Sequence, residues 1–521
     1  MMSTFQGLEM AKQALFAQQS ALHTTGHNIS NANTEGYTRQ RVNFETTSPY
    51  PAASRNRPEI SGQLGTGVEA GSVQRIRNAF LDQQFRSENS KAQYWDTRAD
   101  ALSRMETLLN EPSEQGLNKT MDQFWQSLQD LAANPENSGA RSVVAQRGQA
   151  VADTFHYLSD SLKSMRADTR EQINVQVRQT NTILEKINSI NKQVKNIETN
   201  GQIANDLYDE RDRLLDELSG IVNIDVSYSD SSDSAPEMAD GLATVKIVDE
   251  SGQSLGESAV LVNGNLGEGL EFKEIAIDDY EADSGKNADF AGINGITIGD
   301  QEESFLPPEG SLKGLMETYG HSTGKGTTGS FPDMLNDLDK MAAAFASEFN
   351  TIHKDGQDLN GNSGDEIEDF FTGVPDIEND ESVFGTAGEL AVNGTVMNDP
   401  DLIAASQGGD AGDGSNASAL ADVFDDTDVG LGENTSVRSF YESKIGDMGV
   451  NAEKANTMVE NTGILRSQVE TQRESVSSVS LDEEMTNMIK FQHAYNAAAR
   501  SMTAVDELLD RVINNMGLVG R

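Results

Sequence analysis

Apolar residues recur at helical spacing at both ends of the chain. In the last stretch, residues 480–517, they advance mostly in alternating steps of four and three, which predicts one long helix with a narrow apolar seam. Ser480 and Glu483 stand at capping-box spacing where this helix would begin. The seam consists of Leu481, Met485, Met488, Phe491, Tyr495, Ala498, Met502, Val505, Leu509, Val512 and Met516.

The first stretch, residues 4–31, carries a second narrow seam. Leu8, Leu15, Leu22 and Ile29 recur every seven residues, the spacing of a helix face that packs against a partner helix. A helix of only a few heptads is marginally stable alone in water. We therefore predict that the two ends of the chain pair with each other and with copies of themselves.

Between the ends, helical spacing gives way to a segment of short strands and then returns. Asn134 is predicted to cap the longest helix, with Pro135 as its first residue. Residues 227–309 are rich in Asp, Ser and Gly and contain short alternating segments. The predicted strands are 242–249, 258–262, 270–277 and 293–298.

This order of elements predicts an α+β multidomain fold. Long helices and coiled-coil-like termini, formed by both chain ends, would carry a mainly-β inserted outer domain. The predicted domains are a terminal helical core of 1–60 with 470–521, a helical middle domain of 61–228 with 310–355 and 435–469, and an acidic β-rich outer domain of 229–309 with 356–434.

Charge separates the middle of the chain from its flanks. The 521 residues have a net charge of -45, and 45 of the 84 acidic residues but only 8 of the 39 basic ones lie within 221–440. Such a surface repels nucleic acid and anionic lipid, which excludes both as partners of this part. The same charge suits a salty or alkaline exterior, which predicts that stability rises with salt.

Composition excludes further classes. The chain has no cysteine, which rules out disulfides, thiolate catalysis and cysteine-ligated zinc. It lacks any run of 18 apolar residues, so no membrane insertion is expected. Because the N-terminus lacks an apolar h-region, we expect no cleaved signal peptide; the protein would stay in the cytosol or leave by a route that does not read one.

Residues 358–369 follow a calcium-binding EF-hand loop in part. Oxygen-bearing side chains fill its first, third and fifth positions, but Ser363 replaces the glycine at the sixth and Asp369 the glutamate at the twelfth. The sequence therefore favours a polar turn without a metal. The oxygen-bearing residues are Asp358, Asn360 and Asn362.

Acidic residues at helical spacing within 206–216 allow two interpretations. They could form a carboxylate cluster for acid–base catalysis, or a solvated face bridged by the interleaved Arg211 and Arg213. Acids are so frequent in this chain that we favour the solvated face. The acids concerned are Asp206, Asp209, Asp212 and Asp216.

Histidine and serine give no further site. The histidines are scattered at positions 23, 27, 156, 321, 353 and 493 without a HExxH pattern, and no serine stands in a GxSxG elbow. His353 continues an apolar helix face and is expected to be structural. We predict no catalytic, cofactor-binding or metal-binding residue, and no enzyme.

The N-terminal run GLEMAKQALFAQQSALHTTGHNISNANTEGYTRQRV resembles the signature of bacterial flagellar axial proteins. Its ending GYTRQ is similar to the FlgK family of hook-associated proteins. The resemblance covers about residues 1–228, 310–365 and 395–521 and is most specific at EPSEQGL, DLAANPEN, NDLYDERD and VSLDEEMTNMIKFQHAYNAAARSM. The matching signature residues are Asn28, Asn31, Asn33, Thr34, Gly36 and Tyr37.

The resemblance implies a non-enzymatic subunit of the flagellum, outside the cell at the hook–filament junction. It implies export through the flagellar type III apparatus, a chaperone on the C-terminal helix, and a ring of copies between hook protein on one side and a second junction protein and the filament on the other. Alternatives are another axial protein, hook protein or flagellin, and an adhesin, glycan-binding protein or enzyme carried by the β insert. The predicted subunit interface is Leu8, Leu15, Leu22, Ile29, Leu481, Met485, Met488, Phe491, Tyr495, Met502, Val505 and Leu509.

Overall fold

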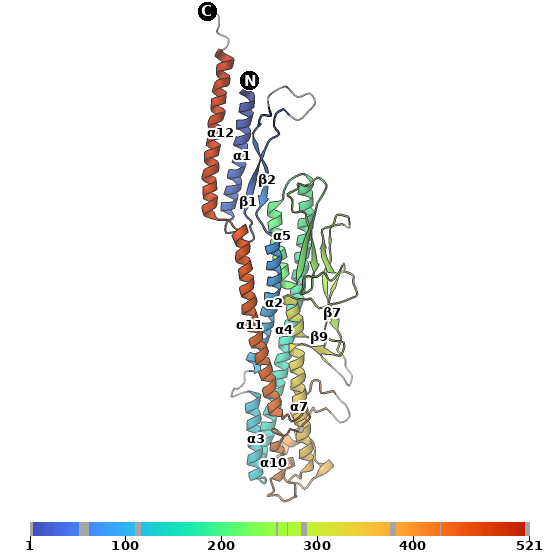
Figure 1. The fold of residues 1–521 in the computed structure, drawn as a ribbon. Coiled ribbons are helices and arrows are strands. Elements are labelled where there is room, and N and C mark those ends of the chain that lie inside the picture. The colour runs from blue at the N-terminus through green and yellow to red at the C-terminus, as the bar shows by residue number, and fades with distance from the viewer. Residues whose placement is uncertain are drawn as a thin grey trace, which may run out of the picture.

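The chain folds into a long rod with its first and last helices side by side at one end (Figure 1). The structure is a computed structural model. Its described residues are 4–51, 62–109, 116–256, 259–267, 269–282, 289–375, 382–427 and 429–515. The predicted seam residue Met516 and the predicted helix end at Gly517 fall outside these ranges.

Two helices and a hairpin form the upper end of the rod, which we name the terminal unit. Acidic residues fill the first turn of α12, where they face the positive end of the helix dipole. The hairpin strands pair antiparallel, with a register shift between Asn43 and Phe44. The elements are α1 (Thr4–Ser30), β1 (Gln40–Thr46), β2 (Val68–Arg75) and α12 (Leu481–Asn515).

Long helices make the body of the rod. The helix α11 runs antiparallel to α2, so that Arg473 near the end of α11 lies 3.8 Å from Asp82 near the start of α2. None of the described helices has the length and hydropathy needed to cross a membrane. The body helices are α2 (Ala79–Leu109), α3 (Leu117–Ala133), α4 (Ser138–Thr199), α5 (Asn205–Ile221), α6 (Ser311–Tyr319), α7 (Ser330–Asp355) and α11 (Val437–Ser477).

The longest helix, α4, begins three residues later than predicted. Asn137 caps it, because its Oδ1 accepts hydrogen bonds from the backbone N–H groups of Gly139 and Ala140. The prediction that Asn134 is the cap was wrong: Asn134 ends α3, and its carbonyl accepts from the N–H of Asn137 in a turn. Pro135, which we predicted as the first residue of this helix, therefore lies in the turn before it.

Two four-stranded sheets flank the second half of α4. All pairs are antiparallel except β8 with β9. Strands are confirmed within 242–249, 258–262 and 293–298, although residue 258 lies outside the described residues, and 270–277 divides into β6 and the first part of β7. The first sheet, in the order β3-β4-β5-β6, contains β3 (Ile224–Ser229), β4 (Leu242–Ile247), β5 (Val260–Asn263) and β6 (Glu271–Phe272); the second, in the order β10-β9-β8-β7, contains β7 (Ile275–Tyr280), β8 (Gly292–Ile298), β9 (His321–Ser322) and β10 (Thr327–Thr328).

Short elements cover the end of the rod that lies away from the terminal unit. The buried guanidinium of Arg141, on the first turn of α4, donates to the carbonyl oxygens of Pro135 at 2.7 Å and Ile403 at 2.6 Å. This side chain ties the short elements to the helices. They are η2 (Gly364–Glu366), β11 (Phe371–Thr372), α8 (Thr386–Glu389), β12 (Ala391–Val392), α9 (Gly394–Asn398), η4 (Pro400–Leu402) and α10 (Ser415–Asp422).

The buried apolar residues form two large cores along the rod. One joins both sheets to α5, α6 and the second half of α4. The other joins the short elements after α7 to α3, α7 and the first half of α4, around a group of packed phenylalanines. The segments 229–309 and 356–434, which we assigned to one outer domain, therefore pack in different cores, apart from Phe290 of the first segment, which joins the second core.

Candidate functional site

The terminal helices α1 and α12 pack along each other. Ala11, Ala17 and Ala21 are buried on α1, which contacts both α12 and the hairpin. A Cβ placed on Gly7 would stand 3.6 Å from Cγ2 of Val505 in α12. Small residues at such contacts allow two helix axes to approach closely.

The structure places the predicted seam residues in different environments. Most are half-buried between α1, α12 and the hairpin, and Leu509 is buried. Leu481, Met485 and Met502, however, are exposed. The half-buried members are Leu8, Leu15, Leu22, Ile29, Met488, Phe491, Tyr495 and Val505.

Asn28 uses all four hydrogen-bonding positions of its side-chain amide. Its Nδ2 donates to the carbonyl of Gln40 at 2.8 Å and to Oε2 of Glu484 at 3.1 Å. Its Oδ1 accepts from the hydroxyl of Tyr37 at 2.8 Å and from the N–H of Gln40 at 3.0 Å. One buried side chain thus connects the end of α1 with β1 and with the start of α12.

The rest of the signature forms the turn after α1. Asn31 Nδ2 donates to the carbonyl of His27, and Thr34 Oγ1 donates to Asn31 Oδ1 at 3.3 Å. Gly36 has φ of 78°, a conformation that favours glycine. Asn33 is exposed at the tip of the turn. Asn31, Thr34 and Gly36 thus shape the turn, and Tyr37 joins it to His27 and Asn28 in α1. Asn28 alone reaches across to β1 and α12.

Arg39 joins this turn to the point where α11 ends and α12 begins. Its guanidinium pairs with Glu483 at 2.7 Å and Glu484 at 2.8 Å, both in the first turn of α12. Its backbone N–H donates to the carbonyl of Ser477 at 2.9 Å. The connection between α11 and α12 is therefore fixed by the segment that follows α1.

Next to this turn lies a larger set of ion pairs, which we name the arginine–aspartate network. At its centre Asp212 is buried and lies 2.9 Å from Arg75, 3.0 Å from Arg77 and 3.2 Å from Arg86. These arginines come from β2, from the segment after it, and from α2. The members of the network are Arg75, Arg77, Arg86, Arg473, Asp82, Asp209, Asp212, Asp216 and Asp240.

Burial and charge oppose each other at the centre of the network. Burial alone would raise the pKa of Asp212, but the guanidinium groups of Arg77, Arg75 and Arg86 hold that pKa well below its usual range. At Asp209, in contrast, burial raises the pKa against the effect of Arg75. Asp212 is therefore ionised at neutral pH and cannot act as a general acid there.

The interpretation of the aspartates in 206–216 as a solvated face was wrong for the two central residues. Asp209 and Asp212 are buried, and their cations come from other elements and not from the neighbouring arginines. Arg213 does bridge the solvated side of α5, to Glu210 and Glu217. Helical spacing alone could not show which face would be covered.

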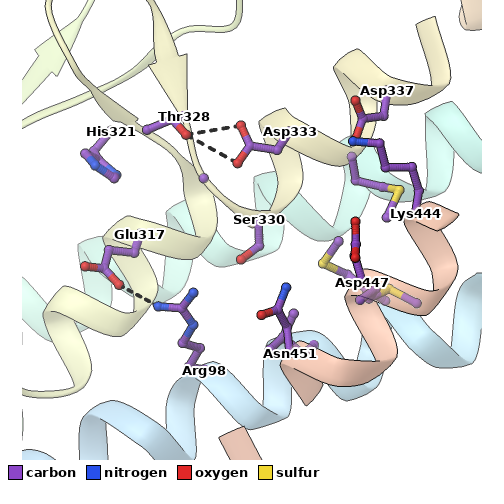
Figure 2. Close-up of a pocket in the computed structure, with 15 residues that line it drawn as sticks. Arg98, Glu317, His321, Thr328, Ser330, Asp333, Asp337, Lys444, Asp447 and Asn451 are labelled. Carbon is purple, nitrogen blue, oxygen red and sulfur yellow. Dashed lines mark hydrogen bonds and ion pairs between the residues drawn. The ribbon is translucent and has the colours of Figure 1, made fainter. Parts of the chain in front are cut away.

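A cavity of 370 Å³ lies between α2, α6, α7 and α11 (Figure 2). Four of its charged groups form two ion pairs: Arg98 lies 3.1 Å from Glu317, and Lys444 lies 2.9 Å from Asp337. Burial raises the pKa of Asp333 at its edge. Each of the two ion pairs bridges two different helices, so this polar set stabilises the packing of the body.

The EF-hand-like segment is a hydrogen-bonded turn in the structure. Asp358 accepts from the N–H of Asn362 at 2.8 Å and from its Nδ2 at 2.7 Å, and Asp369 pairs with Lys354 at 2.7 Å. Within the described ranges, no three His, Asp or Glu residues are grouped as metal ligands. His353 is buried, and its Nε2 accepts from the N–H of Ala404 at 3.0 Å; burial lowers the pKa of His353 to about 4.

Comparisons with known proteins agree with this architecture. The family model described as "Flagellar hook-associated protein FlgK helical domain" matches residues 102–371. Models of the flagellar basal body rod protein and of the FlgEFG C-terminal region match residues 8–38 and 471–516, which lie in the terminal unit and the end of α11. More than half of the chain thus matches the helical domain model alone.

Whole-length relatives match as well. "Flagellar hook-associated protein 1" of Bacillus subtilis is 45% identical over 526 residues, and the match covers 100% of both chains. The protein of the same name from Escherichia coli is 25% identical, over 97% of this chain and 98% of that protein. The solved flagellar hook junction protein FlgK of Burkholderia pseudomallei shares the fold, with a TM-score of 0.57 at 14% identity, covering 76% of this chain and 100% of that one. The chain belongs to the FlgK family of flagellar hook-associated proteins.

Proposed function

We propose that the chain is a structural subunit at the junction between hook and filament, assembled through its terminal helices into a ring of identical copies. Hook protein would bind one side of the ring, and a second junction protein and the filament the other. The names of the relatives support the place in the flagellum. One observation supports the mode of assembly: α12 has an apolar face that remains exposed although the helix is already packed on α1.

That face is regular. Leu481, Met485 and Ile489 follow at intervals of four residues and are 48%, 53% and 56% exposed. On α1, Phe5 and Phe16 are also exposed, and because they are eleven residues apart they lie on one side of the helix. Rows of large exposed apolar side chains are typical of surfaces that bind another protein.

The predicted interface is modified accordingly. Half-buried members such as Met488 and Tyr495 contribute to the packing inside one chain, whereas Leu481, Met485 and Met502 are available to a neighbour. We add Phe5, Phe16 and Ile489, which the heptad pattern did not select. Before assembly, the exposed face of α12 would be the surface that an export chaperone covers during type III export without a cleaved signal peptide.

The experiment replaces the apolar row of α12 without changing the fold. The triple variant L481S/M485S/I489S should keep the circular dichroism and unfolding temperature of the parent, because the three side chains are exposed. In a strain that lacks the gene, it should fail to restore motility, and cells should carry hooks and release unassembled flagellin. The control is Q492S, at an exposed polar position of the same helix. Full motility of the triple variant at normal export would contradict the proposal.

A further inference from the structure

The loop that joins β3 to β4, residues 230–241, lies against the terminal unit; we name it the bridging loop. Asp240 of this loop forms an ion pair with Arg75 at the end of β2. The Sδ atom of Met238 lies 3.0 Å from Oγ of Ser72 in β2 and 3.8 Å from Nδ2 of Asn43 in β1. The bridging loop therefore connects the inserted sheet to both strands of the terminal hairpin.

The root of the bridging loop covers two buried charges. The carbonyl of Gly241 accepts from Nη1 of Arg211 at 2.7 Å, and its N–H donates to Oε1 of Glu198 at 3.3 Å. Arg211 and Glu198 are fully buried. Among the described residues, Nε and Nη2 of Arg211 and Oε2 of Glu198 have no hydrogen-bond partner.

These groups oppose the closed position of the loop. A buried charged group with unsatisfied hydrogen-bonding atoms loses free energy of hydration that the remaining contacts restore only in part. If the loop lifts, water reaches Arg211 and Glu198, whereas the contacts of Asp240 and Met238 are lost. The contacts of Asp240 and Met238 thus favour the closed position, and hydration of Arg211 and Glu198 favours the open one. An element with two states requires such a balance.

The geometry of the loop ends allows such a movement without unfolding of the sheet. Ser229 and Leu242 are paired across β3 and β4, which fixes the base of the loop. Gly241 has φ of 76°, and a Cβ at this position would stand 2.2 Å from the carbonyl oxygen of Ser229. Only glycine fits here, so the loop leaves the sheet in one sharp turn.

We propose that the bridging loop is a latch that closes on the terminal hairpin and lifts from it when Asp240 and Met238 detach, while Arg75 stays paired with Asp209 and Asp212. The latch is a property of the free chain. Its use during assembly, when neighbouring copies bind the terminal unit, rests on the proposed function. It is therefore tested on the isolated protein, and its failure would leave the proposed function untouched.

The first test measures the position of the bridging loop. Because the chain has no cysteine, spin labels can be attached to E237C on the loop and K192C on α4, which are both exposed. Double electron–electron resonance should give a narrow distance distribution for the parent and a broader one for M238S/D240N. The control D233N removes an acidic charge from an exposed position of the same loop and should stay narrow. Equal distributions in all three proteins would overturn the latch.

Hydrogen exchange separates release of the latch from unfolding. In M238S/D240N, the amide of Gly241 should lose protection about tenfold, as expected when a contact of a charged group worth about 1.4 kcal/mol is lost, while β4 stays protected. Oxidation of S72C/M238C should increase protection of 230–241 relative to its reduced form. The latch is contradicted if β4 loses protection together with the loop. It is also contradicted if the S72C–M238C disulfide forms but leaves the protection of 230–241 unchanged.

Discussion

At the scale of single residues, the amide of Asn28 closes the contact between α1, β1 and α12. Its hydrogen-bond partners are the backbone of Gln40, the hydroxyl of Tyr37 and the carboxylate of Glu484. An aspartate would keep the two acceptor contacts but would face the carbonyl of Gln40 and the carboxylate of Glu484 with a negative oxygen. The position therefore requires an amide, and not only a polar side chain.

Replacement of this amide should loosen the terminal unit. N28A removes the partner of buried groups on Gln40 and Glu484, for which a loss of about 3 kcal/mol in local stability is expected. Hydrogen exchange of the amides in β1 and in the second half of α1 measures this loss. The matched control N33A, at the exposed tip of the same turn, should change exchange little. If both variants exchange alike, the role given to Asn28 is wrong.

His353 should give the unfolding free energy a defined pH dependence. Burial lowers the pKa of this histidine from 6.5 to about 4, so between these values the unfolded chain binds more protons than the folded one. Stability should therefore fall as pH falls through this window, by about 3 kcal/mol at most. H353Q retains an acceptor for the N–H of Ala404 and lacks the titration. Urea unfolding at pH 4 to 7 should show a steeper slope for the parent than for H353Q; identical slopes would refute this assignment.

At the scale of elements, α5 has one face in the arginine–aspartate network and one in solvent. D212N leaves the buried guanidinium groups of Arg75, Arg77 and Arg86 without their common anion, which should cost about 3–5 kcal/mol of unfolding free energy. E210Q, on the solvated face of the same helix, should cost less than about 1 kcal/mol. Denaturant unfolding compares the two. A small effect of D212N would mean that the network contributes little to stability.

The sequence predicted these elements better than their contacts. The apolar period identified α12, and the capping-box spacing of Ser480 and Glu483 identified its start, because both signals are local. The partners of Asp212 could not be predicted, since Arg75 and Arg86 lie more than 120 residues before it and spacing gives no distance between elements. The heptad pattern placed Met485 in the predicted interface but could not show that its side chain stays exposed within one chain.

At the scale of the whole molecule, the acidic middle should make stability depend on salt. Most of the net charge of -45 lies in 221–440, and its self-repulsion is screened over about 10 Å at 0.1 M salt and about 3 Å at 1 M. We expect the unfolding temperature to rise by a few degrees, roughly 1 kcal/mol, between these concentrations. Differential scanning calorimetry checks this. A fall in unfolding temperature would show that attractive ion pairs outweigh repulsion.

The fold class and the helical ends followed from the sequence, whereas the division of the middle did not. Composition grouped 229–309 with 356–434 because both are acidic and rich in glycine. Packing separates them, because α4 is 62 residues long and each half of it collects a different core. Surface charge carries little information about which buried residues meet. The limits of the three predicted domains remain predictions.

The pairing of the first helix with the last has a consequence for the order of folding. In a disordered chain, closing a loop of about 450 residues would cost roughly 5 kcal/mol, more than a short helix pair supplies. The body removes most of this cost, because α2 beside α11 brings Arg39 to Ser477 before α1 and α12 meet. We therefore expect the terminal pair to form last, and a chain that is truncated before α12 cannot form it. The two ends should therefore pair only in a subunit that contains both terminal helices and whose body is already folded.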